Sequence, residues 1–208
     1  MLRLFLTLIA LIVEPFLKIG AHFLSFALNK NGNAAAALIR GRIYGWYWGC
    51  KRLKLEHNVL FVYPKHISLA DGVTIYNNVN ISAHPNGTVR IGQRSHIAKD
   101  SIIAGYAGVT IGEACSISSG VRIYTTSNGI KDVDRPMVEQ REIAPVSIGN
   151  NVLIGANVVV LPGVVIGDHS VIAAGSVVNK NVGAYEIVGG QPIRLLRNRL
   201  GNEAKEIS

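Results

Sequence analysis

A spacing of six residues between branched apolar side chains constrains the fold of this chain more than any other feature. In the stretch 146–182 such residues recur without a gap at Ile148, Ile154, Val160, Ile166, Ile172 and Val178. The residue four places after each of them is small, as in Val152 and Ser170. A period of six matches neither the 3.6 residues of a helical turn nor the alternation of a two-faced strand. Hexapeptide repeats are typical of parallel β-helices, so the pattern predicts a solenoid.

The same register continues toward the N-terminus and gives five groups of three hexapeptides. Besides the two groups in 146–182, the groups start at Leu69, Ile91 and Ile111 and continue through Ile75 and Ile81, Ile97 and Ile103, and Ile117 and Ile123. Three hexapeptides close one triangular coil, with a short parallel strand on each side and the branched residues stacked inside. We therefore predict an all-β domain of about five coils, stacked at the spacing of hydrogen-bonded strands, about 4.8 Å.

The breaks in the register all follow the third hexapeptide of a group. Extra residues occur after Ile81, after Ile103 and, as the longest insertion, between Ile123 and Ile148. All three insertions should therefore leave the same edge of the prism. Functional residues concentrate on loops that a rigid scaffold positions. We expect the functional site at this edge, with a long active-site loop at 124–147.

Composition and charge separate residues 1–60 from residues 61–208. The first segment holds eight Lys or Arg and two acidic residues, whereas the second holds thirteen and eleven, so the excess charge lies in the N-terminal segment. No basic stripe follows the repeats, and a nucleic-acid partner is not expected. The two cysteines form no disulfide framework, and the chain has no zinc-type spacing, so no metal is expected.

Residues 1–60 combine apolar runs with a cluster of aromatic and basic side chains. The run from Leu4 to Val13 is too short to span a bilayer as a helix, which needs about 20 residues. Further on, Tyr44, Trp46, Tyr47 and Trp48 lie among arginines and lysines, as in segments at a membrane–water interface. We predict a helical, membrane-associated segment that is peripheral or re-entrant. The alternative is that these helices pack on the repeat domain or on sister subunits.

Residues 61–200 resemble the hexapeptide-repeat acyltransferases, in particular the maltose, galactoside and capsular-polysaccharide O-acetyltransferases. The resemblance depends on the repeats, on the long loop, on the stretch PVSIGNNVLIGANVVVLPGVVIGDHSVIAAGSVVNKNV and on the closing GGQPIRLLR. It implies a left-handed β-helix, assembled as a homotrimer, and a short C-terminal helix through Leu195, Leu196 and Leu200. It also implies acetyl-CoA as donor, bound between neighbouring subunits, and a histidine base that deprotonates a sugar hydroxyl.

The residues that contact CoA in the family correspond to a set that includes several cations. They are Ala156, Ala174, Asn179, Lys180, Arg194 and Arg197. The three cations suit the phosphates of CoA. Their alternative interpretation is ordinary solvated charge.

The position of the family's catalytic histidine corresponds to Asn128. An amide has no protonation equilibrium near neutral pH, whereas imidazole titrates near 6.5, so Asn128 cannot act as a general base. Three explanations remain: an engineered change, a natural sequence with a relocated base, or a protein that binds without catalysis. The best candidate for a relocated base is His84, because it leaves the same edge two coils away. Its alternative role is that of a turn residue in His84-Pro85-Asn86-Gly87.

The sequence thus predicts a membrane-associated, trimeric O-acyltransferase of cell-surface polysaccharide synthesis. It would move an acetyl group from acetyl-CoA to a hydroxyl of a sugar or a lipid-linked glycan, at the cytoplasmic face of the bacterial inner membrane. The alternative is an inactive trimeric scaffold that binds CoA or a partner at that membrane.

Overall fold

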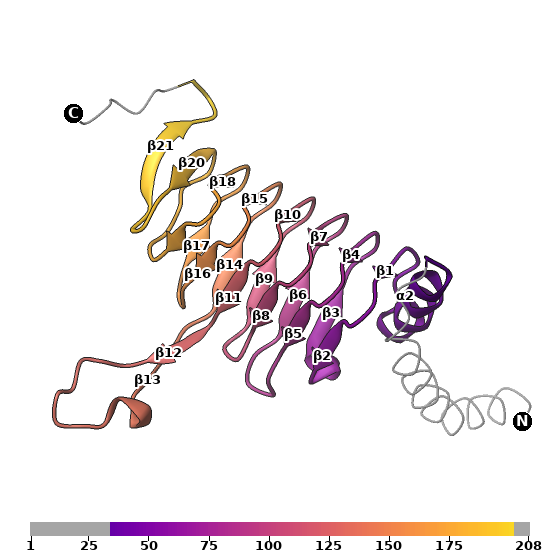
Figure 1. The fold of residues 1–208 in the computed structure, drawn as a ribbon, viewed down its shortest axis with the longest axis horizontal. Helices are drawn as coiled ribbons and strands as arrows, with labels where there is room; N and C mark the ends of the chain where they lie inside the picture. Colours follow the sequence, from indigo (N-terminus) through magenta and orange to yellow (C-terminus); the bar gives the residue numbers. More distant parts are fainter. Residues whose placement is uncertain (1–33, 202–208) are drawn as a thin grey trace, which may run out of the picture.

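The computed structural model describes residues 34–201 of the 208-residue chain. These residues form a β-solenoid with one helix at its N-terminal end (Figure 1). The apolar runs of residues 1–33 lie outside the described residues, as does the end of the chain after residue 201. Within 34–201, no helix is long and apolar enough to cross a membrane.

Three sheets form the sides of the solenoid, and each coil contributes one strand to each sheet. Sheet A contains β1 (Lys54–Leu55), β4 (Thr74–Ile75), β7 (His96–Ile97), β10 (Ser116–Ile117), β15 (Leu153–Ile154), β18 (Val171–Ile172), β20 (Glu186–Gly189) and β21 (Arg194–Asn198). Sheet B contains β2 (Leu60–Val62), β5 (Asn80–Ser82), β8 (Ile102–Ala104), β11 (Arg122–Tyr124), β16 (Val159–Val160) and β19 (Val177–Val178). Sheet C contains β3 (Ile67–Leu69), β6 (Val89–Ile91), β9 (Val109–Ile111), β14 (Val146–Ile148) and β17 (Val165–Ile166).

The predicted interior stacks are confirmed. All fifteen branched residues of the five predicted groups are buried, and none is more than 3% exposed. Ile75, Ile97 and Ile117 follow one another in register on sheet A, as do Ile81, Ile103 and Ile123 on sheet B. The solenoid predicted from the repeats is confirmed, and the left-handed β-helix that the resemblance implies is the fold of this chain.

The number of coils differs from the prediction. Sheet A has seven strands in parallel, from β1 to β20, and the solenoid has about seven turns instead of five. The additional coil at the N-terminal end buries Leu55 and Phe61 at the repeat positions, and the last one buries Val188. The predicted groups do not include these residues because Phe61 replaces an aliphatic branched side chain and because Val188 comes ten positions after Val178 instead of six.

The predicted C-terminal helix is wrong for the residues that carried it. Leu195 and Leu196 belong to β21, which pairs antiparallel with β20, while Leu200 follows that strand. The open edge of β20 offers unpaired backbone groups, and a further strand satisfies them. A helix here would also lack an apolar face to bury, because Leu195, Leu196 and Leu200 are 47%, 52% and 71% exposed.

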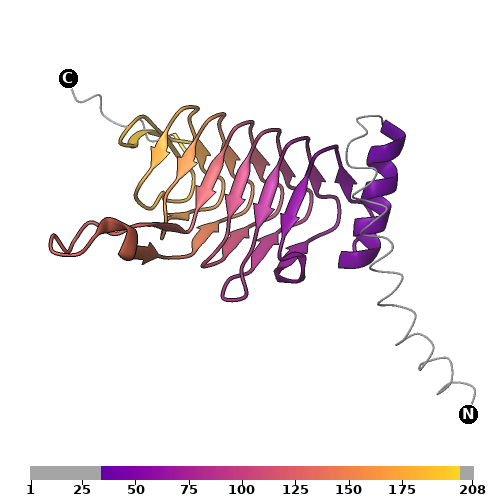
Figure 2. The ribbon, with the colours of Figure 1, turned by 60° about the horizontal axis from the view of Figure 1, so that its bottom comes forward.

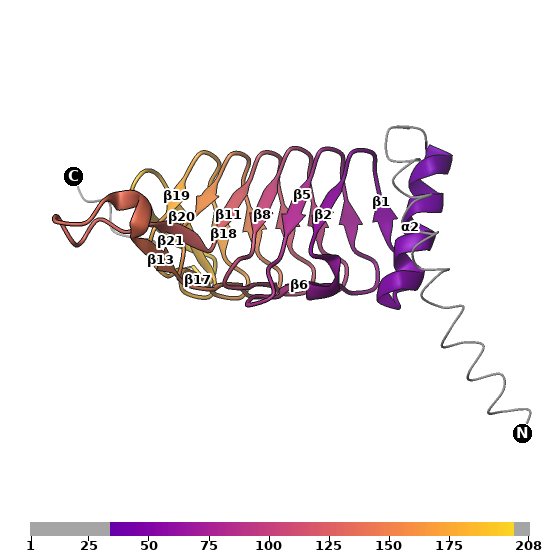
Figure 3. The ribbon, with the colours of Figure 1, turned by 90° about the horizontal axis from the view of Figure 1, so that it is seen from below.

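Helix α2 (Ala34–Trp48) closes the N-terminal end of the solenoid (Figures 2 and 3). The ring centroid of Tyr44 lies 5.2 Å from that of Phe61, and the ring centroid of Trp48 lies 4.8 Å from that of Phe61. The helix ends at Gly49, whose φ of 72° is left-handed, and the amide of Cys50 donates to the carbonyl of Gly45, as in a Schellman cap. Two of the four aromatic residues of this cluster, Tyr44 and Trp48, therefore pack on the repeat domain, as the alternative interpretation predicts.

Candidate functional site

All the insertions leave one edge of the prism, as predicted. This loop edge, between sheets B and C, carries residues 63–66, 83–88, 105–108 and 125–145. The longest insertion forms a two-stranded hairpin of β12 (Thr126–Asn128) and β13 (Arg141–Ile143), which extends away from the solenoid (Figures 1 and 2). Between the two strands lies the 3₁₀ turn η2 (Met137–Glu139).

Asn128 lies exposed on this hairpin, directly opposite Arg141. Side chains that face each other across an antiparallel pair lie on the same side of the ribbon. The neighbouring pair, Ser127 and Glu142, therefore lies on the other side, where Glu142 pairs with Lys131 at 3.4 Å. The face that carries Asn128 thus presents an amide beside a guanidinium and offers no general base.

His84 is half-buried at the loop edge between two tyrosines. Its ring stacks on Tyr106 with 4.0 Å between ring centroids, and it meets Tyr63 edge-on at 5.8 Å. Its Nδ1 accepts a hydrogen bond from the backbone N–H of Asn86 at 3.3 Å. In the neutral ring the proton is therefore on Nε2, which can donate a hydrogen bond but cannot accept a proton.

The structure does not bring His84 and Asn128 together within one chain. Strand β8 separates β5, which precedes His84, from β11, which precedes the hairpin. The two predicted catalytic positions are therefore not assembled into one site within a single chain.

The six predicted donor positions occupy three places in one chain. Ala156 and Ala174 stack at the corner between sheets A and B, where the amide of Gly175 donates to the carbonyl of Ala156. Asn179 and Lys180 directly follow β19, where that strand of sheet B ends, and both are exposed. Arg194 and Arg197 lie on β21, the last strand of sheet A.

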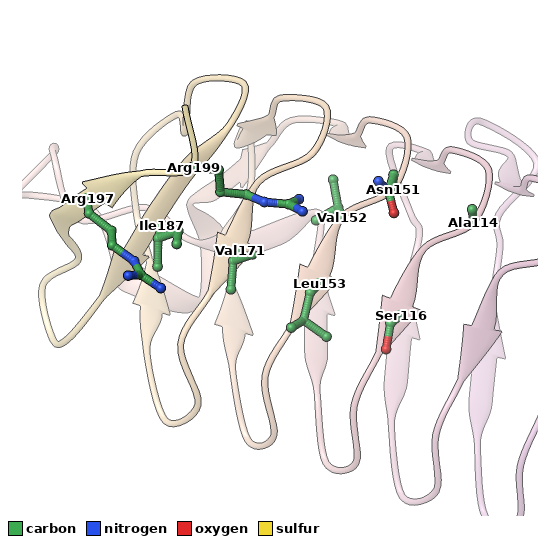
Figure 4. A pocket seen from close by; sticks show the side chains of 9 residues that line it. All are labelled: Ala114, Ser116, Asn151, Val152, Leu153, Val171, Ile187, Arg197 and Arg199. Atoms are coloured by element: carbon green, nitrogen blue, oxygen red, sulfur yellow. The ribbon is translucent and has the colours of Figure 1, made fainter. Parts of the chain in front are cut away.

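A groove of 440 Å³ lies on the outer face of sheet A (Figure 4). It is lined by Arg197, one of the predicted donor positions, and by residues that the sequence did not indicate. Its floor contains a row of apolar side chains in register, Leu153, Val171 and Ile187. Arg197 lies at one end, and the side chain of Arg199 extends along one side of the groove toward Val152 (Figure 4). Arg199 is fixed there, because its Nη1 donates to the carbonyl of His169 at 2.6 Å and its amide donates to the carbonyl of Tyr185. An apolar floor with one guanidinium group at its end and another along its side suits a chain-like ligand that carries phosphates.

The sequence missed Arg199 because the closing segment was predicted as a helix. Residues two apart lie on opposite sides of a helix but on the same side of a strand. Arg197 lies on β21, and Arg199 follows it in the turn after Asn198, where its hydrogen bonds to Tyr185 and His169 hold it beside the same groove.

The cysteines and the acidic residues provide no further chemistry. Cys115 is buried, its Sγ lies 3.0 Å from the carbonyl oxygen of Gly149, and burial raises the pKa of its thiol, which suits a packing residue. Among the described residues, no group of three or more His, Cys, Asp or Glu side chains is close enough to hold a metal ion.

Two family models match this chain, and both describe hexapeptide-repeat transferases. Residues 145–180 match the family described as bacterial transferase hexapeptide (six repeats), and residues 88–125 match the hexapeptide repeat of succinyl-transferase. Both matches lie in the solenoid.

Relatives of this chain among curated proteins are named acetyltransferases. The chain is 42% identical over 89 residues to the galactoside O-acetyltransferase of Escherichia coli. The aligned stretch covers 43% of this chain and 43% of that protein. The chain is 38% identical over 109 residues to a putative acetyltransferase of Saccharomyces cerevisiae, which is 52% of this chain and 55% of that protein. The chain thus spans about half of the length of these two relatives.

Solved structures with the same fold include acyltransferases. AntD, an N-acyltransferase from Bacillus cereus in complex with dTDP and 3-hydroxybutyryl-CoA, aligns with a TM-score of 0.65 at 25% identity, over 72% of this chain and 81% of that one. A hexapeptide-repeat acetyltransferase from Vibrio cholerae aligns with a TM-score of 0.57 at 26% identity, over 89% and 92% of the two chains. The resemblance of this chain to the hexapeptide-repeat acyltransferases, predicted from its repeats, is confirmed.

Proposed function

We propose that this protein is an acyl-CoA-dependent O-acyltransferase that moves an acetyl group to a hydroxyl of a sugar or a lipid-linked glycan in cell-surface polysaccharide synthesis. The observation that carries the proposal is the groove on sheet A, with its apolar floor and its two arginines. The similarity to acetyltransferases and to an acyl-CoA-bound neighbour supports a CoA thioester as the donor. We further propose that the enzyme works as a homotrimer at the cytoplasmic face of the bacterial inner membrane.

In the proposed reaction the hydroxyl oxygen of the acceptor attacks the thioester carbonyl carbon. The new C–O bond forms, the C–S bond breaks, and the hydroxyl proton is transferred to the sulfur of the leaving CoA thiol. The arginines of the groove would pair with phosphates of CoA and leave the thioester to extend along the apolar floor. Within one chain His84 lies at the edge between sheets B and C, away from the groove on sheet A. In the proposed homotrimer the His84 of a neighbouring copy would therefore donate its Nε2 proton to the oxygen on which negative charge develops.

A specific observation favours a second candidate, the scaffold that binds CoA without turnover. Asn128 occupies the position that corresponds to the family's catalytic histidine and lies opposite Arg141. In neutral His84, Nδ1 accepts a hydrogen bond from Asn86, so Nε2 carries a proton instead of a lone pair. Such a protein would keep the donor groove and lack the base.

The two candidates are separated by restoring an imidazole at the hairpin. We expect Asn128→His to raise acetyl transfer at least about a hundredfold, which is the size of a general-base contribution. The pH profile should show a rise with pH through the titration of imidazole, near 6.5. Ser127→His is the matched control, because it places the same ring one residue away on the opposite side of the hairpin.

The outcome is measured as release of free CoA thiol with acetyl-CoA and a panel of sugars, and as the Kd for CoA. A gain in Asn128→His but not in Ser127→His, with equal CoA affinity, supports the enzyme. If CoA binds and neither variant transfers acetyl, the scaffold is the better description. If CoA does not bind to the original sequence at all, both candidates fail.

Within the described residues, the membrane proposal is supported by the outward side of α2. Leu38, Ile39 and Trp46 are 64%, 46% and 49% exposed there, next to exposed Arg42. We expect Leu38→Glu with Trp46→Glu to move the full chain from the membrane pellet to the supernatant without lowering its Tm. Retention of this double variant in the pellet would count against α2 as the contact.

A further inference from the structure

A second groove, on a different sheet from the donor groove, lies at the base of the loop edge. It has a volume of 350 Å³ and is lined by three stretches, 85–90, 107–110 and 145–147. These belong to three successive coils and lie next to the His84 loop and to the point where the hairpin returns to the solenoid. None of the proposed donor positions lines it.

The outer face of sheet C supplies a row of polar side chains to this groove. Arg90, Thr110 and Ser147 are in register on β6, β9 and β14, so their side chains emerge side by side. At about 4.8 Å per strand, the row is about 10 Å long. Asn86 and Thr88 add an amide and a third hydroxyl at its edge.

Arg90 is the only charged residue that lines the groove. Its Nη1 donates to Oγ1 of Thr88 at 2.7 Å, which fixes the guanidinium on the wall. Within residues 34–201, no carboxylate lies within ion-pair distance of Arg90. A held guanidinium without a counter-charge, surrounded by hydroxyl groups, favours an anion attached to a polar body.

Two coils pack backbone to backbone at the floor of the groove. A Cβ at Gly87 would lie 2.3 Å from the carbonyl oxygen of Tyr106 and 2.6 Å from the amide of Gly108, so the backbones of two coils are in direct contact there. A site built on such a floor keeps its shape when the ligand is absent.

We infer that this groove binds the phosphate-bearing part of the acceptor, with Arg90 pairing with the phosphate and the hydroxyl row contacting the sugar. The inference depends on the proposed function only in calling the ligand the acceptor. It restricts the acceptor class to sugar phosphates, including sugars linked through phosphate to a nucleotide or a lipid.

The test uses the full chain, glucose 1-phosphate as the probe, and glucose and inorganic phosphate as comparisons. We expect glucose 1-phosphate to bind more tightly than either comparison, and Arg90→Met to weaken it at least about tenfold, the loss expected for a charge-assisted contact. Arg90→Lys, which keeps the charge without the paired donors, should fall in between. Arg94→Met is the matched control, because Arg94 is also exposed but does not line the groove.

Three results would overturn the inference: no binding of glucose 1-phosphate to the original sequence, equal affinity in Arg90→Met, or an equal loss in Arg94→Met. Inorganic phosphate that binds as tightly as glucose 1-phosphate, with the same dependence on Arg90, would also overturn it, as an anion site without a sugar contact. The Kd for CoA is measured in parallel. If the original sequence binds glucose 1-phosphate but does not bind CoA, the result contradicts the proposed function and still supports this groove as a binding site.

Discussion

Gly41 lets α2 lie against the first coil more closely than any other residue would allow. A Cβ at this position would lie 2.0 Å from the carbonyl oxygen of Leu53, which is a backbone atom and cannot turn aside. We expect Gly41→Ala to destabilise the protein by about 1–3 kcal/mol, the usual cost of overpacking. The measurement is the midpoint of urea unfolding. Leu38→Ala, on the exposed side of the same helix, should change it by less than about 0.5 kcal/mol.

Asp71 couples the stability of the same region to pH. Its carboxylate accepts hydrogen bonds from the amides of Lys51 and Arg52 and pairs with the Arg52 guanidinium at 2.8 Å. The hydrogen bond from the Arg52 side chain is the main reason that the pKa of Asp71 is lowered from 3.8. A carboxyl group whose pKa is lower in the folded state stabilises above its unfolded pKa and loses this contribution as pH falls through the folded pKa.

The expected result is a steeper fall of Tm for the original sequence than for Asp71→Asn as pH drops below about 4. At pH 7, Asp71→Asn should have the lower Tm. Asp134→Asn, in the exposed hairpin, is the control and should follow the original sequence throughout. Parallel curves for Asp71→Asn and the original sequence would show that the ion pair contributes nothing measurable.

At the scale of elements, the strands were predictable and the two ends of the solenoid were not. Ile97, Ile117 and their counterparts have the same surroundings in every coil, so a period in the sequence is sufficient to place them. Phe61 is different because its partners, Tyr44 and Trp48, come from a helix with no counterpart in the repeats. The end at β21 is also unique, since it depends on the open edge of β20. The loop edge was predictable for the same reason as the strands, whereas the groove at Arg199 required the course of β21.

The role of β21 in donor binding has a direct test. We expect Arg197→Met to raise the Kd for CoA at least about tenfold, because a charge-assisted contact to phosphate is lost at the end of the groove. Val188 and Ile193, which pack beneath this strand, are untouched, so the Tm should stay the same. Arg122→Met provides the control on sheet B, away from the groove. An unchanged Kd in Arg197→Met, measured by calorimetry, would remove β21 from the proposed donor site.

At the scale of the whole molecule, the proposed trimer explains why the predicted site residues occupy separate corners of one chain. The donor positions lie on sheet A and at both ends of sheet B, and the hairpin extends away from its own solenoid (Figure 2). A neighbouring copy against sheet B would bring its own residues to these positions. Sheet B favours this arrangement because more of its outward residues are apolar: Leu60, Val62, Ile102, Val159 and Val177 are apolar, whereas Asn80, Ser82 and Arg122 are polar or charged. Those of sheet C are mostly polar and suit a face that stays open to solvent.

A lysine introduced on sheet B or on sheet C tests which of the two sheets forms the subunit interface. We expect light scattering to give about three times the chain mass of 22.4 kDa for the original sequence. Leu60 and Val165 are similarly exposed, at 52% and 48%, but lie on sheets B and C. Leu60→Lys should dissociate the assembly, since a buried ammonium without a partner is costly, and Val165→Lys should leave it intact. Dissociation by Val165→Lys alone would place the interface on sheet C and close the groove at Arg90, so this experiment also constrains where an acceptor can enter.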